Sequence, residues 1–115
     1  MLALEFEERL EDIKRRIIEA FEPQRIILFG SHVYGKPTGD SDVDLLIVME
    51  SEERPVVRAA RVSRLLRPRP FPMDIIVRTP AEIQQRLQIG DQFIREILEQ
   101  GRVLYEQDLP ERMGS

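Results

Sequence analysis

The sequence predicts a mixed α/β, or α+β, domain in which helices cover a mixed sheet of three or four strands. Short apolar runs that suit buried strands alternate with segments whose apolar residues recur every three or four positions, as in amphipathic helices. The length of 115 residues fits one domain, since domains usually contain roughly 100–200 residues. We expect residues 1–107 to form that domain and residues 108–115 to be a flexible tail.

The first half of the chain is predicted to run helix, strand, loop, strand. An amphipathic helix is indicated by five apolar residues at steps of three and four, Phe6, Leu10, Ile13, Ile17 and Phe21. Pro23 stops it, and the apolar run 25–29 then suits a buried strand that ends at Gly30. Residues 30–42 are rich in turn-forming types, and strand-like composition returns at 43–48.

The second half is predicted to contain three helices and two strands. The first helix leads from Glu52 towards Leu66, and a strand follows at 71–78. We expect the buried side of that helix to consist of Val56, Val57, Ala60 and Leu66. Thr79 and Pro80 then have the marks of a helix start, because Glu82 lies three residues after the hydroxyl cap.

A last helix and strand are predicted after Gly90. Asp91 can cap the helix, and Gly101 is expected to end it in a left-handed conformation. The inward-facing residues of this helix are expected to be Phe93, Ile94, Ile97 and Leu98. Residues 102–105 then suit a short final strand.

The composition excludes several classes of protein. The chain has no cysteine, so a metal would be held by oxygen or histidine ligands, which favours hard cations. No apolar run approaches the ~20 residues that span a bilayer. The amino terminus is acidic where a signal peptide would be basic and then apolar, which predicts a cytoplasmic protein. A net charge of −4 argues against general nucleic-acid binding.

One basic segment interrupts this acidic chain. Six arginines lie at positions 54, 58, 61, 64, 67 and 69. We interpret them as the solvated face of a helix; the alternative is a docking surface for an acidic partner or a nucleotide.

Three aspartates are candidates for chemistry. Asp42 and Asp44 point to the same side of the strand that begins there, because a strand repeats its facing every two residues. Such close like charges are costly unless a proton or cation neutralises them, so the pair suits Mg²⁺. If the strand of Asp74 pairs with that of Asp44, all three carboxylates can converge around two metal ions. The alternative is that Asp42 caps a turn and Asp74 pairs with an arginine.

A phosphate-binding turn is predicted next to these acids. Gly30 and Ser31 directly follow a buried strand, where glycine lets an anion approach the backbone and a helix starting at Ser31 would add its positive end. Residues 30–35 (Gly-Ser-His-Val-Tyr-Gly) and 41–45 (Ser-Asp-Val-Asp-Leu) resemble the signature of the DNA polymerase β-type nucleotidyltransferase superfamily. With Asp74 as the third acid, the likeness reaches from the first helix to Tyr105, and the length is similar to minimal nucleotidyltransferase (MNT) domains.

The resemblance implies the nucleotidyltransferase fold and a role for each motif residue. Two Mg²⁺ ions would be bound by Asp42, Asp44 and Asp74, with Asp74 also binding or deprotonating the attacking hydroxyl. The nucleotide, with ATP as the expected donor, would be bound by Gly30, Ser31, Gly35 and Ser41.

The chain departs from many relatives, which carry arginines between the two glycines of the first motif. Here His32 and Tyr34 occupy that stretch, so Lys36 or an arginine from elsewhere would have to supply positive charge. A structural role is favoured for His32 over donation to a phosphate, and packing over the loop for Tyr34. Asp40 is expected to serve a turn.

The resemblance also implies a partner. Minimal domains of this kind pair with a helical HEPN-domain protein, in toxin–antitoxin systems where the nucleotidyltransferase transfers AMP to a tyrosine of the HEPN ribonuclease. Our first hypothesis is therefore a protein adenylyltransferase acting as antitoxin. The second is a module that neutralises its partner by contact alone. Transfer to a small molecule or nucleic acid is disfavoured, and self-association stays open.

Overall fold

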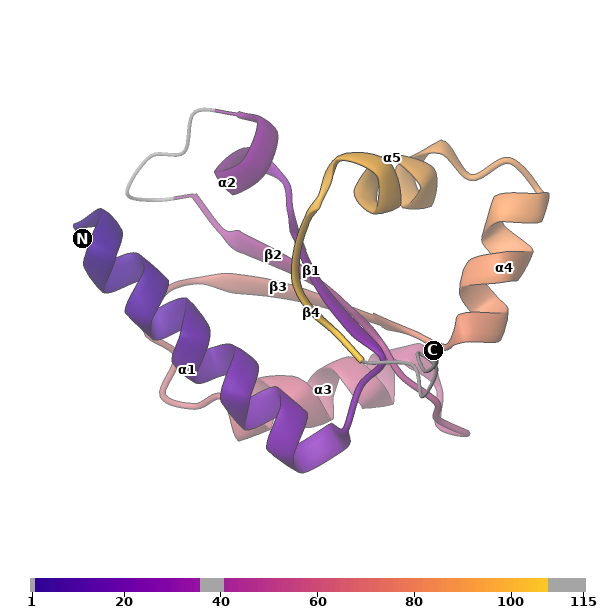
Figure 1. Ribbon diagram of the computed structural model, residues 1–115. Helices are drawn as coiled ribbons and strands as arrows, with labels where there is room; N and C mark the ends of the chain where they lie inside the picture. Colours follow the sequence, from indigo (N-terminus) through magenta and orange to yellow (C-terminus); the bar gives the residue numbers. More distant parts are fainter. Residues whose placement is uncertain (1, 36–40, 108–115) are drawn as a thin grey trace, which may run out of the picture.

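A computed structural model of the chain describes residues 2–35 and 41–107. In chain order its elements are α1 (Ala3–Phe21), β1 (Arg25–Phe29), α2 (Ser31–Tyr34), β2 (Val43–Val48), α3 (Pro55–Leu65), β3 (Met73–Arg78), α4 (Pro80–Gln88), α5 (Gln92–Gln100) and β4 (Arg102–Glu106). The strands form one mixed sheet in the order β3-β2-β1-β4 (Figure 1). β1 is antiparallel to β2 and β4, whereas β2 and β3 are parallel. The predicted class, a mixed sheet of three or four strands covered by helices, is confirmed.

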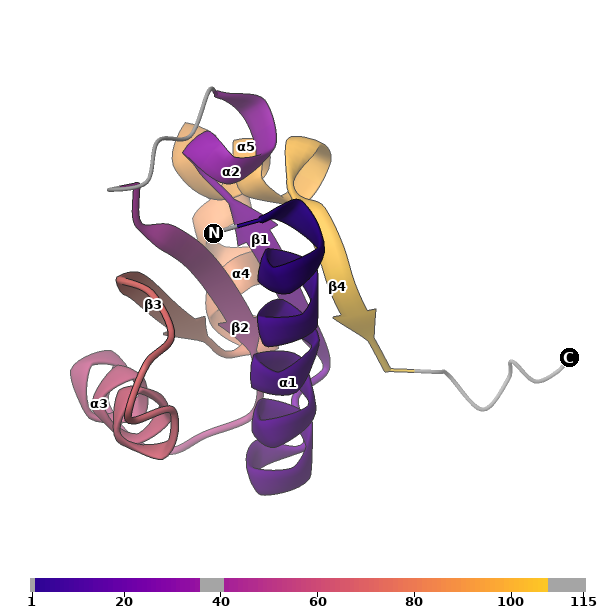
Figure 2. The same ribbon diagram turned by 90° about the vertical axis from the view of Figure 1, so that its left-hand side faces the viewer.

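Helices cover both faces of the sheet. α1 and α3 lie on one face, where Leu10, Ile13 and Ile17 of α1 pack against alternate residues of the strands (Figure 2). α4 and α5 lie on the other, where Ile83, Ile94 and Ile97 pack against the residues in between. The described chain therefore has two clusters of buried residues separated by the sheet, because successive strand residues point to opposite faces.

The predicted starts of the last two helices are confirmed. The Thr79 hydroxyl accepts from the backbone N–H of Glu82 at 3.1 Å, and the Glu82 carboxylate accepts from that of Thr79 at 2.9 Å. Asp91 likewise accepts from the N–H of Ile94 at 3.1 Å. The cap at Thr79 fixes where the polypeptide leaves β3, and the cap at Asp91 fixes the start of α5.

The predicted buried side of the helix after Glu52 was wrong at three of its four residues, and only Leu66 is buried as expected. α3 begins at Pro55, and Val56, Val57 and Ala60 are exposed, while Arg58, Val62 and Leu66 are buried. The reason is the ion pair that Arg58 of α3 forms with Glu82 of α4. Nη1 and Nη2 of Arg58 donate to the two oxygens of Glu82 at 2.6 and 3.1 Å, and Nε donates to the carbonyl of Glu53 at 2.7 Å.

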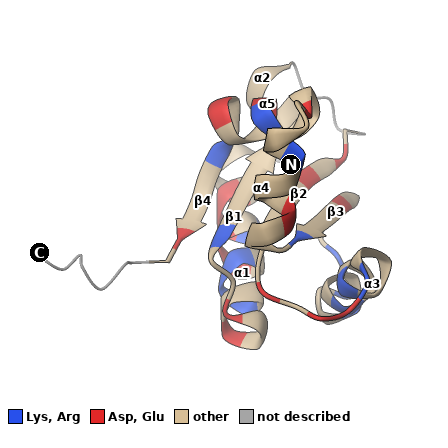
Figure 3. Cartoon of the chain, turned by 90° about the vertical axis from the view of Figure 1, so that its right-hand side faces the viewer, with Lys and Arg blue, Asp and Glu red and all other residues tan. Residues whose placement is uncertain are grey.

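The same contacts correct the interpretation of the basic segment as one solvated face. Arg58 is only 4% exposed, because its charge is matched by Glu82. The other five arginines of the segment are exposed, so the solvated interpretation holds for them. Figure 3 shows Lys and Arg residues, in blue, gathered on α3.

Two predictions for the last helix were also wrong. Phe93 is 54% exposed instead of facing inward, although its ring touches that of Phe29. Gly101 has φ −68°, which is not left-handed. A side chain there would collide with Ile27 and with the carbonyl of Ile97, so close packing explains the glycine.

Several expectations concern residues outside the described ranges. These are the positive charge of Lys36, the turn role of Asp40 and the tail at 108–115. Among the described helices, none is long and apolar enough to cross a membrane.

Candidate functional site

The parallel pairing of β2 and β3 places two of the three predicted acids side by side. Asp44 is the register partner of Asp74, and on its other side it is the partner of Phe29 in β1. Phe29 and Leu46 belong to the cluster under α4 and α5, so Asp44 and Asp74 lie on that face of the sheet. Figure 3 shows acidic residues, in red, near the starts of both strands.

Asp42 completes this group from the residues just before β2. Its side chain is exposed, whereas Asp44 is half-buried. The pKa of Asp44 is raised, chiefly because burial disfavours its charged form and then because Asp74 and Asp42 are like charges nearby; His32 partly offsets this. The charge of Asp44 is therefore coupled to the charges of Asp74 and Asp42.

Gly30 lies directly against Asp44. Its backbone has φ 84° and ψ −156°, a conformation that is essentially restricted to glycine. A Cβ at this position would collide with Oδ2 of Asp44. The end of β1 and the start of β2 are therefore in contact through a residue that cannot carry a side chain.

The predicted helix after Gly30 is present as the single turn α2. Amides of Val33 and Tyr34 donate to the carbonyl of Gly30 at 2.9 and 3.1 Å. The Gly35 amide donates to the carbonyl of Ser31 at 3.1 Å, and a side chain on Gly35 would press against Ser31. Gly35 thus closes the turn that begins with Ser31, directly after Gly30.

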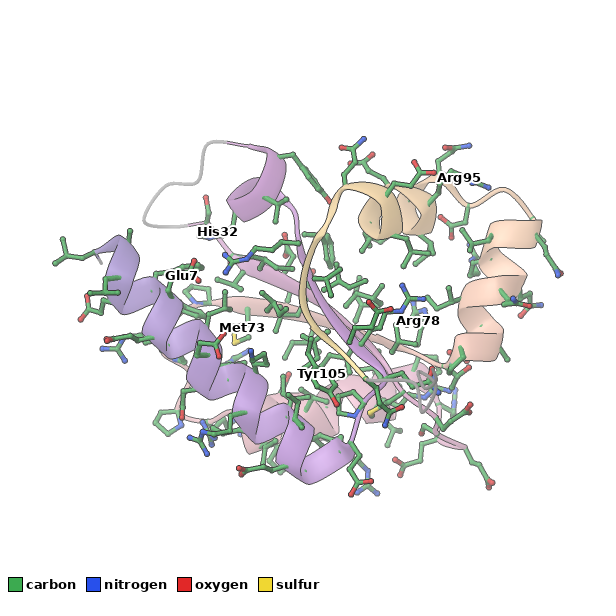
Figure 4. The ribbon with its side chains drawn as sticks, viewed as in Figure 1. Glu7, His32, Met73, Arg78, Arg95 and Tyr105 are labelled. Carbon is green, nitrogen blue, oxygen red and sulfur yellow. The ribbon has the colours of Figure 1, made fainter. Side chains whose placement is uncertain are left out.

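His32 connects this turn to the loop that carries Asp42. Its Nε2 lies 3.3 Å from the carbonyl oxygen of Ser41, and its ring stacks on Phe6 of α1 with centroids 5.0 Å apart. In Figure 4 it is labelled between α2 and the start of α1. The favoured structural role of His32 agrees with these contacts. Tyr34 is 41% exposed.

The donor set suits a hard divalent cation. All three acids offer only oxygen, and a cation would offset both the burial and the like charges that raise the pKa of Asp44. Within the described ranges, no three His, Cys, Asp or Glu side chains are already arranged to hold a metal ion.

The sequence interpretation did not single out Arg78 and Phe93 as site residues. Together with Ile76, Arg86, Asp91 and Ile94 they line a hollow of about 310 Å³ between β3, α4 and α5. Position 78 has the same parity as 74 and 76, so the strand pattern could have placed Arg78 on the face of the acids. The position of Phe93 depends on how α5 packs, which no local pattern reveals.

Comparisons with known proteins agree with this geometry. A family model described as a nucleotidyltransferase domain matches residues 10–105. The fold is similar to that of a candidate nucleotidyltransferase from Sulfolobus solfataricus, known from a crystal structure at 1.40 Å resolution. That alignment has a TM-score of 0.62 at 20% identity and covers 87% of this chain and 79% of the other. No curated protein matches the chain. Since the family model spans both motif segments and Asp74, the chain belongs to the nucleotidyltransferase domain family.

Proposed function

We propose that this domain transfers a nucleoside monophosphate, AMP from ATP, to a hydroxyl group of a partner protein. The observation that carries the proposal is the register of β2 and β3, which sets Asp44 beside Asp74, while Gly30, the residue before Ser31, lies against Asp44. Carboxylates for metal ions and a turn for phosphates thus occur at one end of the sheet. Nucleotidyl transfer needs both, because it depends on neutralising charge and aligning the reacting groups.

Each residue has a role in this reaction. Asp42, Asp44 and Asp74 hold two Mg²⁺ ions, which supply charge neutralisation at the triphosphate. Ser31 and the amides beside it bind the β- and γ-phosphates, with Gly30, Gly35 and Ser41 shaping the turn. Asp74 accepts the proton of the attacking hydroxyl. That oxygen bonds to the α-phosphorus, the bond from the α-phosphorus to the bridging oxygen breaks, and pyrophosphate leaves.

The acceptor in this proposal is a helical HEPN-domain protein, and the pair is a toxin–antitoxin system of the cytoplasm. The support is the resemblance of the motif segments to MNT domains. A protein acceptor also fits the net charge of −4, which does not favour a nucleic-acid acceptor.

A second candidate function is a module that silences its partner by contact. It is favoured by His32 and Tyr34, which stand where many relatives have arginines, and by the contact of His32 with Ser41. In that function the acids would be dispensable.

The two functions separate in one experiment. The purified chain, Asp44→Asn and Asp12→Asn are incubated with Mg²⁺, ATP and the HEPN-domain protein encoded beside the chain, and the intact mass of that protein is measured. We expect a gain of one or more AMP masses that Asp44→Asn slows by at least about 100-fold, as when a charge-stabilising group is removed from an active site. Asp12→Asn is the control, because it removes an exposed aspartate of α1 whose ion pair with Arg15 contributes little.

A different result would support the contact function. If no mass is gained, and wild type and Asp44→Asn form the same stable complex, the domain acts by contact.

A further inference from the structure

We propose that the hollow between β3, α4 and α5 binds the base and ribose of the nucleotide, with Arg78 and Phe93 as the residues that determine base specificity. The inference rests on the proposed function, since it places the nucleoside part of the same substrate. It concerns a surface separate from Gly30 and Ser31, which are proposed to bind the phosphates.

The position of the hollow is the first argument. Ile76 and Arg78 follow Asp74 on the same face of β3, so the hollow begins at the next residue of the strand on that face. With a rise of about 3.3 Å per residue, Ile76 lies roughly 7 Å and Arg78 roughly 13 Å from Asp74. A nucleotide whose α-phosphate lies at the acids can extend its ribose and base over this stretch. β1 and α2 lie on the opposite side of β2, which leaves that side to the triphosphate.

The size of the hollow is the second argument. Its volume of about 310 Å³ lies at the lower end of the range of roughly 300–1,000 Å³ that is typical of small-molecule sites. Ile76, Phe93 and Ile94 give it apolar walls, and Arg78 gives it a donor. Such a mixture suits a heterocyclic base, which has an apolar face and a polar edge.

Arg78 is the third argument. It is half-buried, and among the described residues it forms no salt bridge, although its charge helps to lower the pKa of Glu82. The nearby Glu82 is bound by both terminal nitrogens of Arg58, and Asp91 by Arg86 at 2.8 Å. Nη1 of Arg78 donates to the carbonyl of Val77 at 3.0 Å, and its remaining N–H groups can donate to acceptor atoms of a base. Figure 4 shows Arg78 in the space between the sheet and α4.

Phe93 is the fourth argument. It is 54% exposed at the start of α5, and it meets Phe29 edge to face with centroids 5.7 Å apart. Phe29 is in turn the register partner of Asp44. An exposed aromatic ring held between the acids and the hollow is placed to stack on a base, which would cover the ring.

Two ligands that share their phosphates test the proposal. The affinities of Mg²⁺-ATP and of Mg²⁺-tripolyphosphate, which has no nucleoside, are measured by calorimetry for wild type, Arg78→Met, Phe93→Ala and Arg95→Met. We expect Arg78→Met and Phe93→Ala each to weaken ATP binding about tenfold or more while tripolyphosphate binding is unchanged. Arg95→Met is the control, because Arg95 is an exposed arginine of α5 outside the hollow whose pair is Glu99.

Three results would overturn the inference. Unchanged ATP affinity in both variants would place the nucleoside elsewhere. An equal loss for ATP and tripolyphosphate would mean that the substitutions disturb the fold or the phosphate site. If wild type binds neither ligand, the proposed function itself fails and the subsite with it, a pattern distinct from the other two.

Discussion

Asp44 is half-buried between Phe29 and Asp74, and the carboxylate is held there by the packing of β2 against Gly30. Burial and two neighbouring acids raise its pKa, so the folded protein holds its proton more tightly than the unfolded chain does. In the absence of a cation, ionisation of Asp44 therefore works against folding. The residue that we propose as a metal ligand therefore weakens the metal-free protein.

This predicts an unusual effect of Asp44→Asn on stability. Because the pKa is higher in the folded state, the penalty is absent below the ordinary value of 3.8 and grows as pH rises through the folded-state value. The variant should therefore have a higher Tm than wild type at pH 7 in EDTA, and the difference should shrink towards pH 3. Thermal unfolding by circular dichroism measures both. A lower Tm of the variant at pH 7 would show that the carboxylate stabilises the metal-free fold.

Residue by residue, parity predicted part of the site. Asp42 and Asp44 share a facing in any strand that begins there, and Gly30 at the end of an apolar run is a recognisable turn position. The contact of Gly30 with Asp44 could not be predicted in this way, because it depends on how β1 and β2 align. His32 was assigned a structural role without its partners, Phe6 and Ser41, which come from two other segments.

At the level of elements, the Arg58–Glu82 pair joins α3 to α4 beside the edge strand β3. Arg58 also donates to the carbonyl of Val77 at 3.4 Å, so one guanidinium links α3 to both α4 and β3. Hydrogen bonding to Arg58 is the main reason that the pKa of Glu82 is lowered. The strand that carries Asp74 is thus held in place near its far end.

Arg58→Met should therefore destabilise the fold. It removes the guanidinium that pairs with Glu82 and the side-chain donor to the Glu53 carbonyl, and we expect a loss of about 2–4 kcal/mol in the free energy of unfolding, somewhat below a fully buried pair because Glu82 is partly exposed. Arg61→Met on the same helix is the matched control, since its pair with Glu53 is exposed and should cost less than about 1 kcal/mol. Urea unfolding of both variants gives the comparison; equal losses would contradict the role of Arg58.

Sequence patterns predicted some helices better than others, and the Arg58–Glu82 pair shows why. Helices with caps or a single apolar stripe, such as α1 and α4, were placed correctly. The face of α3 was misjudged because a charged residue is buried there by a partner far along the chain. Apolar periodicity has no means of registering such an ion pair, and Val56 and Val57 were therefore counted as buried.

For the molecule as a whole, the candidate site belongs to no single element. β1 and α2 bring Gly30 and Ser31, β2 brings Asp44, and β3 brings Asp74 after the crossover through α3. Order and direction of strands were not readable from the sequence, since apolar runs do not encode their partners. The convergence of the acids could be predicted only on the condition that β2 and β3 pair.

A ligand that spans these elements should stabilise the entire fold. At a concentration 100 times its dissociation constant, Mg²⁺-ATP is expected to add about 2.7 kcal/mol to the free energy of unfolding of wild type. Asp74→Asn should lose most of this gain, because it removes the proposed metal ligand from β3. Urea unfolding with and without Mg²⁺-ATP tests it, with ATP in EDTA as control. A full gain in Asp74→Asn would separate Asp74 from the nucleotide site.

The acids stand at the strand ends, outside both buried clusters of the sheet. Their replacement removes no core volume, so substitutions at these positions should cost little stability. A lineage that no longer needs the reaction can lose all three carboxylates and still inherit an intact scaffold and its surfaces. In this fold, a catalytic domain can therefore become a domain that only binds its partner through few substitutions.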